Sequence, residues 1–134
     1  EHLCKTPMEL RLRMSSFNSF MKRNLDVLKR YEDQKTVKTI PTIVHTVKIG
    51  DIAFATNKYE LFMDYMHRIQ ARSPFIQTFV IQLAGDEGAS YLATERATNN
   101  NGYSASIFDN QVSYVGGQQL VENTLEMLNE LNKE

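Results

Sequence analysis

The stretch IAFATNKYELFMDYMHRIQARSPFIQTFVIQLAG, residues 52–85, decides the fold because its hydrophobic period changes twice. Residues 52–56 are typical of a strand, and apolar side chains then recur every three or four positions, which predicts a helix over 57–72. Pro74 disfavours a helical backbone in the residue before it. The alternation over 75–85 predicts a second strand with apolar residues on both faces, and we expect it to lie at the centre of the sheet.

A long helix is predicted upstream, over residues 6–34. Thr6 is a good N-cap, Pro7 suits the first helical position, and Glu9 completes a capping box. Apolar residues then recur on one helical face. Alternating β-branched residues over 43–49 predict a strand between this helix and the stretch above.

Downstream, the sequence predicts a short strand in SYLAT, a polar loop with one helical turn, and a last helix. The whole pattern predicts an α+β fold, in which a small mixed sheet of about three to five strands packs with three helices. The three predicted helices are approximately 6–34, 57–72 and 117–132.

Composition bounds the class of protein. With 134 residues and 15.4 kDa the chain fits a single domain, 1–134. We expect this domain to consist of an N-terminal helix (1–34) and an α+β core (40–134).

The net charge of −1 gives no reason to expect nucleic acid or a membrane surface as partner. No apolar run approaches the roughly 18–20 residues that span a bilayer, and the lone Cys4 excludes an internal disulfide.

The chain begins with Glu1 instead of methionine, so we interpret it as a processed product or as an excised piece of a longer chain. An excised part exposes apolar surface that its parent covers. The predicted helices 6–34 and 117–132 therefore offer faces for a homodimer.

Short catalytic motifs are absent from the sequence: it holds no P-loop, GxGxxG, HExxH, CxxC or GxSxG. Glu60, Asp64 and His67 follow one another at spacings of four and three on the predicted helix 57–72. This spacing could hold a metal. It is equally typical of a solvated helix face with weak charge pairing.

Glu60 also has a purely structural interpretation. Asn57 is a good N-cap, which places Glu60 at the third helical position, where a capping carboxylate contributes about 0.5–1 kcal/mol. Tyr103, in NNNGYSAS, is open to two interpretations as well. Its ring packs over a neighbouring strand with the hydroxyl in water, or a mobile loop projects its phenol into a site.

Four segments in order resemble the C-terminal part of the neutral/alkaline (non-lysosomal) ceramidase family, in particular its poorly characterised bacterial members. These segments are KIGDIAFATNKYELFMDYMHRIQARSPFIQTFVIQLAG, SYLATERA, NGYSA and GGQQLVENTLEMLNEL. The resemblance covers roughly residues 43–131, and the ordered set carries it.

The resemblance implies a zinc amidase acting on an N-acyl lipid, and it leaves open whether the parent protein is exported. Family members hold zinc with two histidines from the earlier part of the chain and with a glutamate and a tyrosine from the later part. These last two match Glu60 and Tyr103. The histidine pair has no counterpart here, so zinc is expected in the parent and none in this piece alone.

The sequence departs from the family pattern at four positions. Lys58 and Tyr59 stand where the family often has Pro-Gly, Ala93 replaces a proline, and Ser104 replaces an acidic residue. The preferred hypothesis is the C-terminal portion of a ceramidase-like zinc-dependent amide hydrolase, inactive without its missing N-terminal catalytic part. The alternative, which the departures favour, is a non-catalytic scaffold or interaction domain with a degenerate site.

Overall fold

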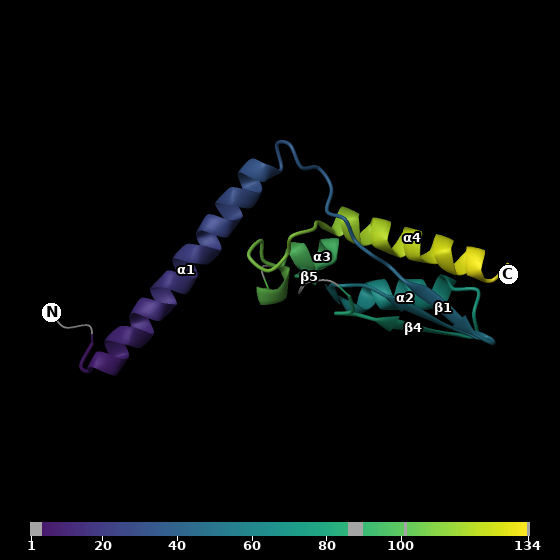
Figure 1. The fold of residues 1–134 in the computed structure, drawn as a ribbon, viewed down its shortest axis with the longest axis horizontal. Helices are drawn as coiled ribbons and strands as arrows, with labels where there is room; N and C mark the ends of the chain where they lie inside the picture. Colours follow the sequence, from purple (N-terminus) through teal and green to yellow (C-terminus); the bar gives the residue numbers. More distant parts are fainter. Residues whose placement is uncertain (1–3, 86–89, 101, 134) are drawn as a thin grey trace. The chain divides into compact units, whose positions relative to one another are not determined.

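A computed structural model describes residues 4–85, 90–100 and 102–133. The chain divides into two compact units, Glu1–Thr39 and Ile40–Glu134, which are treated separately here (Figure 1). The described residues form helices, a three-stranded mixed sheet and a two-stranded sheet, so the predicted α+β class is confirmed. No helix in these ranges is long and apolar enough to cross a membrane.

The first unit is the helix α1 (Pro7–Asp33), in agreement with the prediction. The Glu9 backbone N–H donates to the Thr6 hydroxyl at 3.1 Å, and the Thr6 N–H donates to the Glu9 carboxylate at 3.3 Å. This is the predicted capping box. None of the residues of α1 is buried.

The larger sheet contains β1 (Thr46–Ile49), β2 (Ile52–Thr56) and β4 (Gln77–Ile81), in the order β1-β2-β4. A turn at Gly50, with φ of 59°, joins the antiparallel strands β1 and β2, while β4 runs parallel to β2. The prediction that 75–85 forms the central strand is wrong, because β2 is central and β4 lies at the edge. The apolar residues on both faces of β4 do not mark a central position, because one of these faces is exposed.

The helix predicted over 57–72 begins six residues late, as α2 (Met63–Arg72). The Asn57 side chain caps no helix: it is buried, and its carbonyl oxygen accepts the Tyr59 N–H at 3.0 Å. This contact holds the backbone in a turn. The capping interpretation of Glu60 is therefore wrong, since Glu60 precedes the helix.

Glu60 belongs instead to a second, very small sheet. In it β3 (Glu60–Leu61) pairs in parallel with β5 (Tyr91–Leu92), the short strand predicted in SYLAT. The short helix α3 (Glu95–Thr98) is the predicted helical turn.

The last part of the chain contains the 3-10 turn η1 (Tyr103–Ala105) and the helix α4 (Tyr114–Leu131). α4 begins three residues before the predicted position 117. It lies beside α2, and the two helices cover the same face of the larger sheet (Figure 1).

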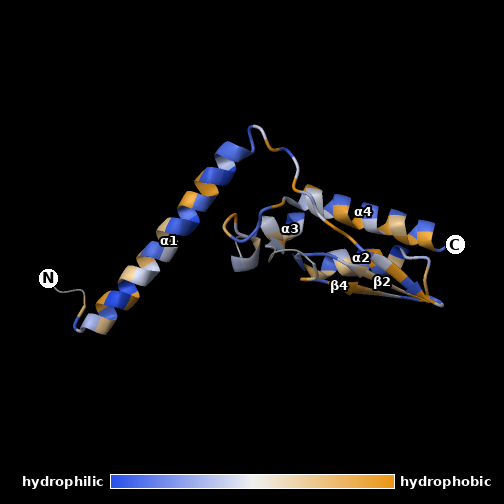
Figure 2. Cartoon of the chain, viewed as in Figure 1, coloured by the Kyte–Doolittle hydropathy of each residue, from blue (hydrophilic) through white to orange (hydrophobic). Residues whose placement is uncertain are grey.

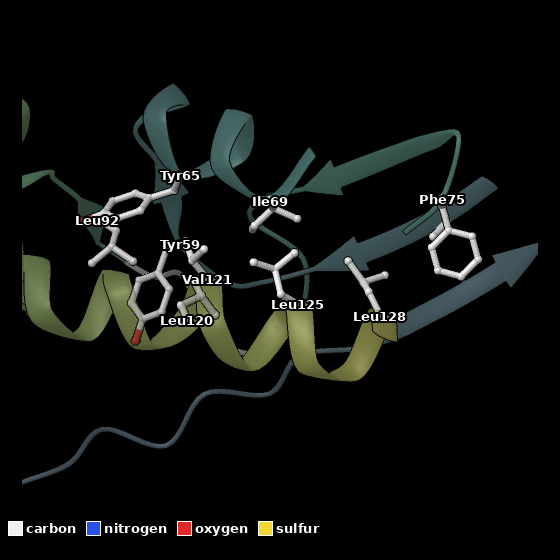
Figure 3. Close-up of a cluster of buried hydrophobic side chains, with 10 residues drawn as sticks. Tyr59, Tyr65, Ile69, Phe75, Leu92, Leu120, Val121, Leu125 and Leu128 are labelled. Atoms are coloured by element: carbon white, nitrogen blue, oxygen red, sulfur yellow. The ribbon is translucent and has the colours of Figure 1, made fainter. Parts of the chain in front are cut away.

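The core lies between this helix pair and the sheet (Figure 3). The inner side predicted for the last helix is confirmed, because Leu120, Val121, Leu125 and Leu128 are all buried. Gly117 of α4 lets the two helices approach closely. The buried apolar residues that form this core include Ala53, Tyr59, Tyr65, Ile69, Phe75, Leu92, Leu120, Val121, Leu125 and Leu128.

Candidate functional site

The β3–β5 pair sets Glu60 beside Tyr91. The register pairs Glu60 with Tyr91 and Leu61 with Leu92. Residues paired in register share a face of the sheet, and successive residues alternate between faces. Leu92 is fully buried, so Glu60 and Tyr91 lie together on the other, partly exposed side.

Tyr103, in η1, also lies beside Tyr91. The Tyr91 and Tyr103 rings lie 5.6 Å apart between centroids at an interplanar angle of 76°, an edge-to-face contact. The Tyr91 hydroxyl lies near enough to both Tyr103 and Glu60 for each of them to raise its pKa. These three side chains form what we call the Glu60–Tyr91–Tyr103 cluster.

The cluster changes the acidity of its central phenol. Hydrogen bonding to Tyr103, and next to Glu60, raises the pKa of Tyr91 to about 12, with smaller contributions from burial and from the negative charge of Glu60. Loss of the Tyr91 proton would remove a donor to the carboxylate and place two negative charges together. At neutral pH the Tyr91 phenol is therefore protonated and lies beside Glu60.

Asn110 ties the segment carrying Tyr103 to β5. Its side-chain carbonyl accepts the Ala93 N–H at 2.9 Å, and its amide donates to the Ser104 and Ser106 carbonyls at 2.7 and 3.1 Å. Asn110 also forms a β-bridge with Tyr91. A single side chain thus links η1 to the strand on which its aromatic partner lies.

The departures from the family pattern have structural roles. The Lys58 ammonium donates to the Pro41 carbonyl at 3.0 Å, and the buried Tyr59 hydroxyl hydrogen-bonds to Thr42 at 2.9 Å. Ala93 supplies the N–H that Asn110 accepts, which a proline would lack. These residues therefore hold the site region together.

The helical metal site at Glu60, Asp64 and His67 is not formed. Glu60 precedes α2, and Asp64 is paired with Arg96 at 3.5 Å. In residues 4–85, 90–100 and 102–133, no group of three His, Cys, Asp or Glu side chains could hold a metal ion. The prediction failed because it placed Glu60 on the helix.

A shallow depression adjoins the two short strands. Phe62 follows β3 directly, and Thr94 lies two residues after β5, so both strands run into it. The depression offers a polar surface with one ion pair, between Asp64 and Arg96. Its lining consists of Phe62, Asp64, Thr94, Arg96, Ala97, Asn99 and Asn100.

The cluster offers two kinds of oxygen donor, a carboxylate and phenols. Carboxylate oxygen is a zinc ligand, and a phenol resembles it as an anionic oxygen donor once deprotonated. A tetrahedral site needs four donors, and the described residues supply only oxygens from this cluster. The other ligands of such a site would have to come from elsewhere.

Tyr91 is the member of the cluster that sequence reasoning missed. The strand in SYLAT was predicted, but its partner strand lies where a helix was expected, so nothing placed Tyr91 beside Glu60. Comparison with known proteins adds no assignment: no protein-family model, no curated protein and no solved structure matches the chain.

Proposed function

We propose that this chain is the C-terminal portion of a ceramidase-like zinc-dependent amide hydrolase, to whose metal site it contributes Glu60 and a tyrosine. One observation carries the proposal. Glu60 and Tyr103, which the family resemblance implies as ligands, are far apart in sequence, yet both lie beside Tyr91: Glu60 pairs with it in register, and the Tyr103 ring contacts the Tyr91 ring. Convergence of these two residues is what a shared metal site requires.

When bound, zinc in such an enzyme polarises the amide carbonyl and supplies a hydroxide near neutral pH. The residues of this chain would hold the metal ion and orient its ligands. Glu60 supplies the carboxylate, and the Tyr91 hydroxyl donates to it, as neighbours of metal ligands commonly do. The remaining ligands and the N-acyl lipid site belong to the preceding part of the parent chain, and this piece alone is inactive.

Two tyrosines compete for the role of ligand. Tyr103 is the residue that the resemblance implies, and it is 70% exposed on a short turn. Tyr91 is the residue that the sheet holds in register with Glu60. Single Tyr→Phe variants of the parent separate the two roles: loss of a ligand removes stoichiometric zinc, whereas loss of an orienting hydroxyl lowers zinc affinity about 10- to 100-fold.

The proposal is tested by the zinc content of the purified parent protein. Glu60→Ala combined with Tyr103→Phe is expected to abolish stoichiometric zinc, and Glu60→Ala combined with Tyr91→Phe is the parallel test. Tyr31→Phe with Glu32→Ala, on exposed positions of α1, is the matched control. Full retention of zinc in both Glu60 double variants would refute the metal site.

A scaffold or interaction domain is the second candidate function. It is favoured by Lys58 and Tyr59, which stand where the family often has Pro-Gly. Here their side chains hydrogen-bond to Pro41 and Thr42 and so have a structural role. Assay of the parent against N-acyl lipids and simple amides, with and without a chelator, separates the two functions. A scaffold predicts no metal-dependent turnover.

A further inference from the structure

The helix α1 exposes large apolar side chains along its whole length (Figure 2). None of its 27 residues is buried. The apolar side of α4, by contrast, is buried in the core. Of the two helix faces that the sequence offers for a homodimer, the face of α1 is therefore the exposed one.

Most of the apolar residues of α1 follow a heptad repeat, in which they recur at alternating spacings of four and three. A period of 3.5 residues is typical of a helix that pairs with another helix, because it keeps one narrow stripe in line with the partner. The apolar members of this stripe are 51–70% exposed, so a partner would bury each of them. The stripe, called the α1 seam below, consists of Leu10, Met14, Phe17, Met21, Asn24, Leu28 and Tyr31.

Asn24 indicates which kind of partner suits the α1 seam. Its side-chain amide donates to the Phe20 carbonyl of the same helix at 2.7 Å, and its amide oxygen is an acceptor. Against lipid chains an acceptor without a donor is costly. Between paired helices, in contrast, a single Asn in the seam fixes the register and the number of helices. The seam therefore suits a second helix better than a membrane surface.

The charges beside the α1 seam match those of a second copy in antiparallel orientation. Arg11 directly follows Leu10 and Glu32 directly follows Tyr31, so both flank the seam on the same side, about 30 Å apart along the helix. In an antiparallel pair such positions face each other, and two-fold symmetry forms the Arg11–Glu32 contact twice. Glu32 also contacts Lys35 at 2.5 Å, but this exposed pair contributes little, and a carboxylate has two oxygens.

The antiparallel arrangement also matches the apolar residues. It places Leu28 opposite Phe17 of the second copy, and on the other side of the seam Phe20 faces Val27 of the second copy. The two Asn24 residues then lie only about 4.5 Å apart along the helix axes, near the two-fold axis. In a parallel pair, Arg11 and Glu32 would stay at opposite ends. Charge complementarity thus favours the antiparallel pair.

We propose that α1 is the self-association helix of this protein, and that its seam pairs antiparallel with the α1 seam of a second copy of the chain. The proposal is independent of the proposed function, because no residue of the Glu60–Tyr91–Tyr103 cluster takes part in the contact. It predicts a dimer of the 134-residue chain that forms and dissociates with concentration.

Leu28 and Leu12 provide a matched pair of variants. Both are leucines of α1 with an exposure of 61%, but only Leu28 belongs to the α1 seam. Sedimentation of the 134-residue chain over a range of concentrations measures the dissociation constant of the dimer. Leu28→Lys is expected to raise this constant about 10-fold or more, because it places two charges in the apolar seam. Leu12→Lys should leave it unchanged.

Arg11 and Glu32 test the orientation of the two helices. Glu32→Arg is expected to raise the dissociation constant severalfold, because two like-charge contacts replace two ion pairs. Arg11→Glu combined with Glu32→Arg exchanges the charges and should restore the wild-type value. This rescue separates a lost contact between copies from a helix that no longer folds.

Five results would overturn the proposal. The first two are a chain that is monomeric at every concentration and a dimer that Leu28→Lys leaves intact, which would place the contact on another face. The next two are equal effects of Leu12→Lys and Leu28→Lys, and a charge exchange that fails to restore the dimer. The last is a monomer that binds vesicles of phosphatidylcholine and phosphatidylglycerol and loses this binding in Leu28→Lys, which would assign the seam to a lipid surface.

Discussion

The two sheets of the second unit are held by different forces. The three-stranded sheet lies on a core of buried apolar side chains from α2 and α4. The β3–β5 pair has two residues per strand, and polar side chains from distant segments extend its pairing. Gln82 accepts the Leu61 N–H at 2.8 Å, and Asn110 accepts the Ala93 N–H at 2.9 Å. Apolar burial thus determines the fold, whereas polar contacts determine the site.

The largest effect on stability is expected from a side chain buried between the larger sheet and its helices. Leu128→Ala removes a fully buried side chain and is expected to lower the free energy of unfolding by about 2–5 kcal/mol. Ile49→Ala, at a 63% exposed position on the side of the larger sheet that α2 and α4 leave open, should change this free energy by about 0.5 kcal/mol or less. Urea denaturation measures both, and equal losses would contradict the distinction between the two faces.

The contact between α2 and α4 gives the next largest effect. A Cβ at Gly117 would overlap the Tyr65 hydroxyl, which donates to the Ala93 carbonyl at 2.9 Å. Gly117→Ala should therefore lower the free energy of unfolding by about 1–3 kcal/mol, although alanine favours a helix more than glycine does. Gly102→Ala, where a Cβ meets open space, is the control for thermal denaturation. Unchanged stability of the Gly117 variant would mean that the helices can separate freely.

Removing the Asn110 side chain should affect the site more than the fold. Asn110→Ala leaves the Ala93 N–H without its hydrogen-bond acceptor and is expected to lower the free energy of unfolding by about 1 kcal/mol. It should also abolish the nuclear Overhauser effect between the Tyr91 and Tyr103 rings. Asn129→Ala, whose amide donates only within α4 to Leu125, is the matched control. A persistent ring contact in the Asn110 variant would show that other contacts position η1.

An exposed ion pair gives the smallest effect. Hydrogen bonding to Arg72 lowers the pKa of Glu122 below its ordinary value of 4.5. The pair therefore stabilises the fold above pH 4.5, and this contribution is lost as the pH falls through the lower pKa of the folded state. Glu122→Gln should remove this small contribution, so its melting temperature should lie slightly below that of the wild type at pH 7 and meet it as the pH falls below 4.5. A variant curve parallel to the wild type would contradict the assignment.

The sequence allowed prediction of the elements whose cause is local or periodic. The capping box of α1, the strand 52–56 and the apolar side of α4 all have such causes. The start of α2 was not predictable in this way. Asn57 and Glu60 have the spacing of a capping pair, but Glu60 forms its backbone hydrogen bond with Ser90, far along the chain. The cluster was missed in part for the same reason, because no local signal pairs Glu60 with Tyr91.

The measurement that tests the central claim most directly is the titration of the Tyr91 hydroxyl in the 134-residue chain, by NMR with labelled tyrosine. The predicted pKa is about 12, and it should fall toward 10 in Tyr103→Phe and in Glu60→Gln. Because the pKa is raised on folding, stability from Tyr91 should be present below pH 10 and lost as the pH rises to about 12. A wild-type pKa near 10, unchanged in both variants, would show that the three side chains do not converge.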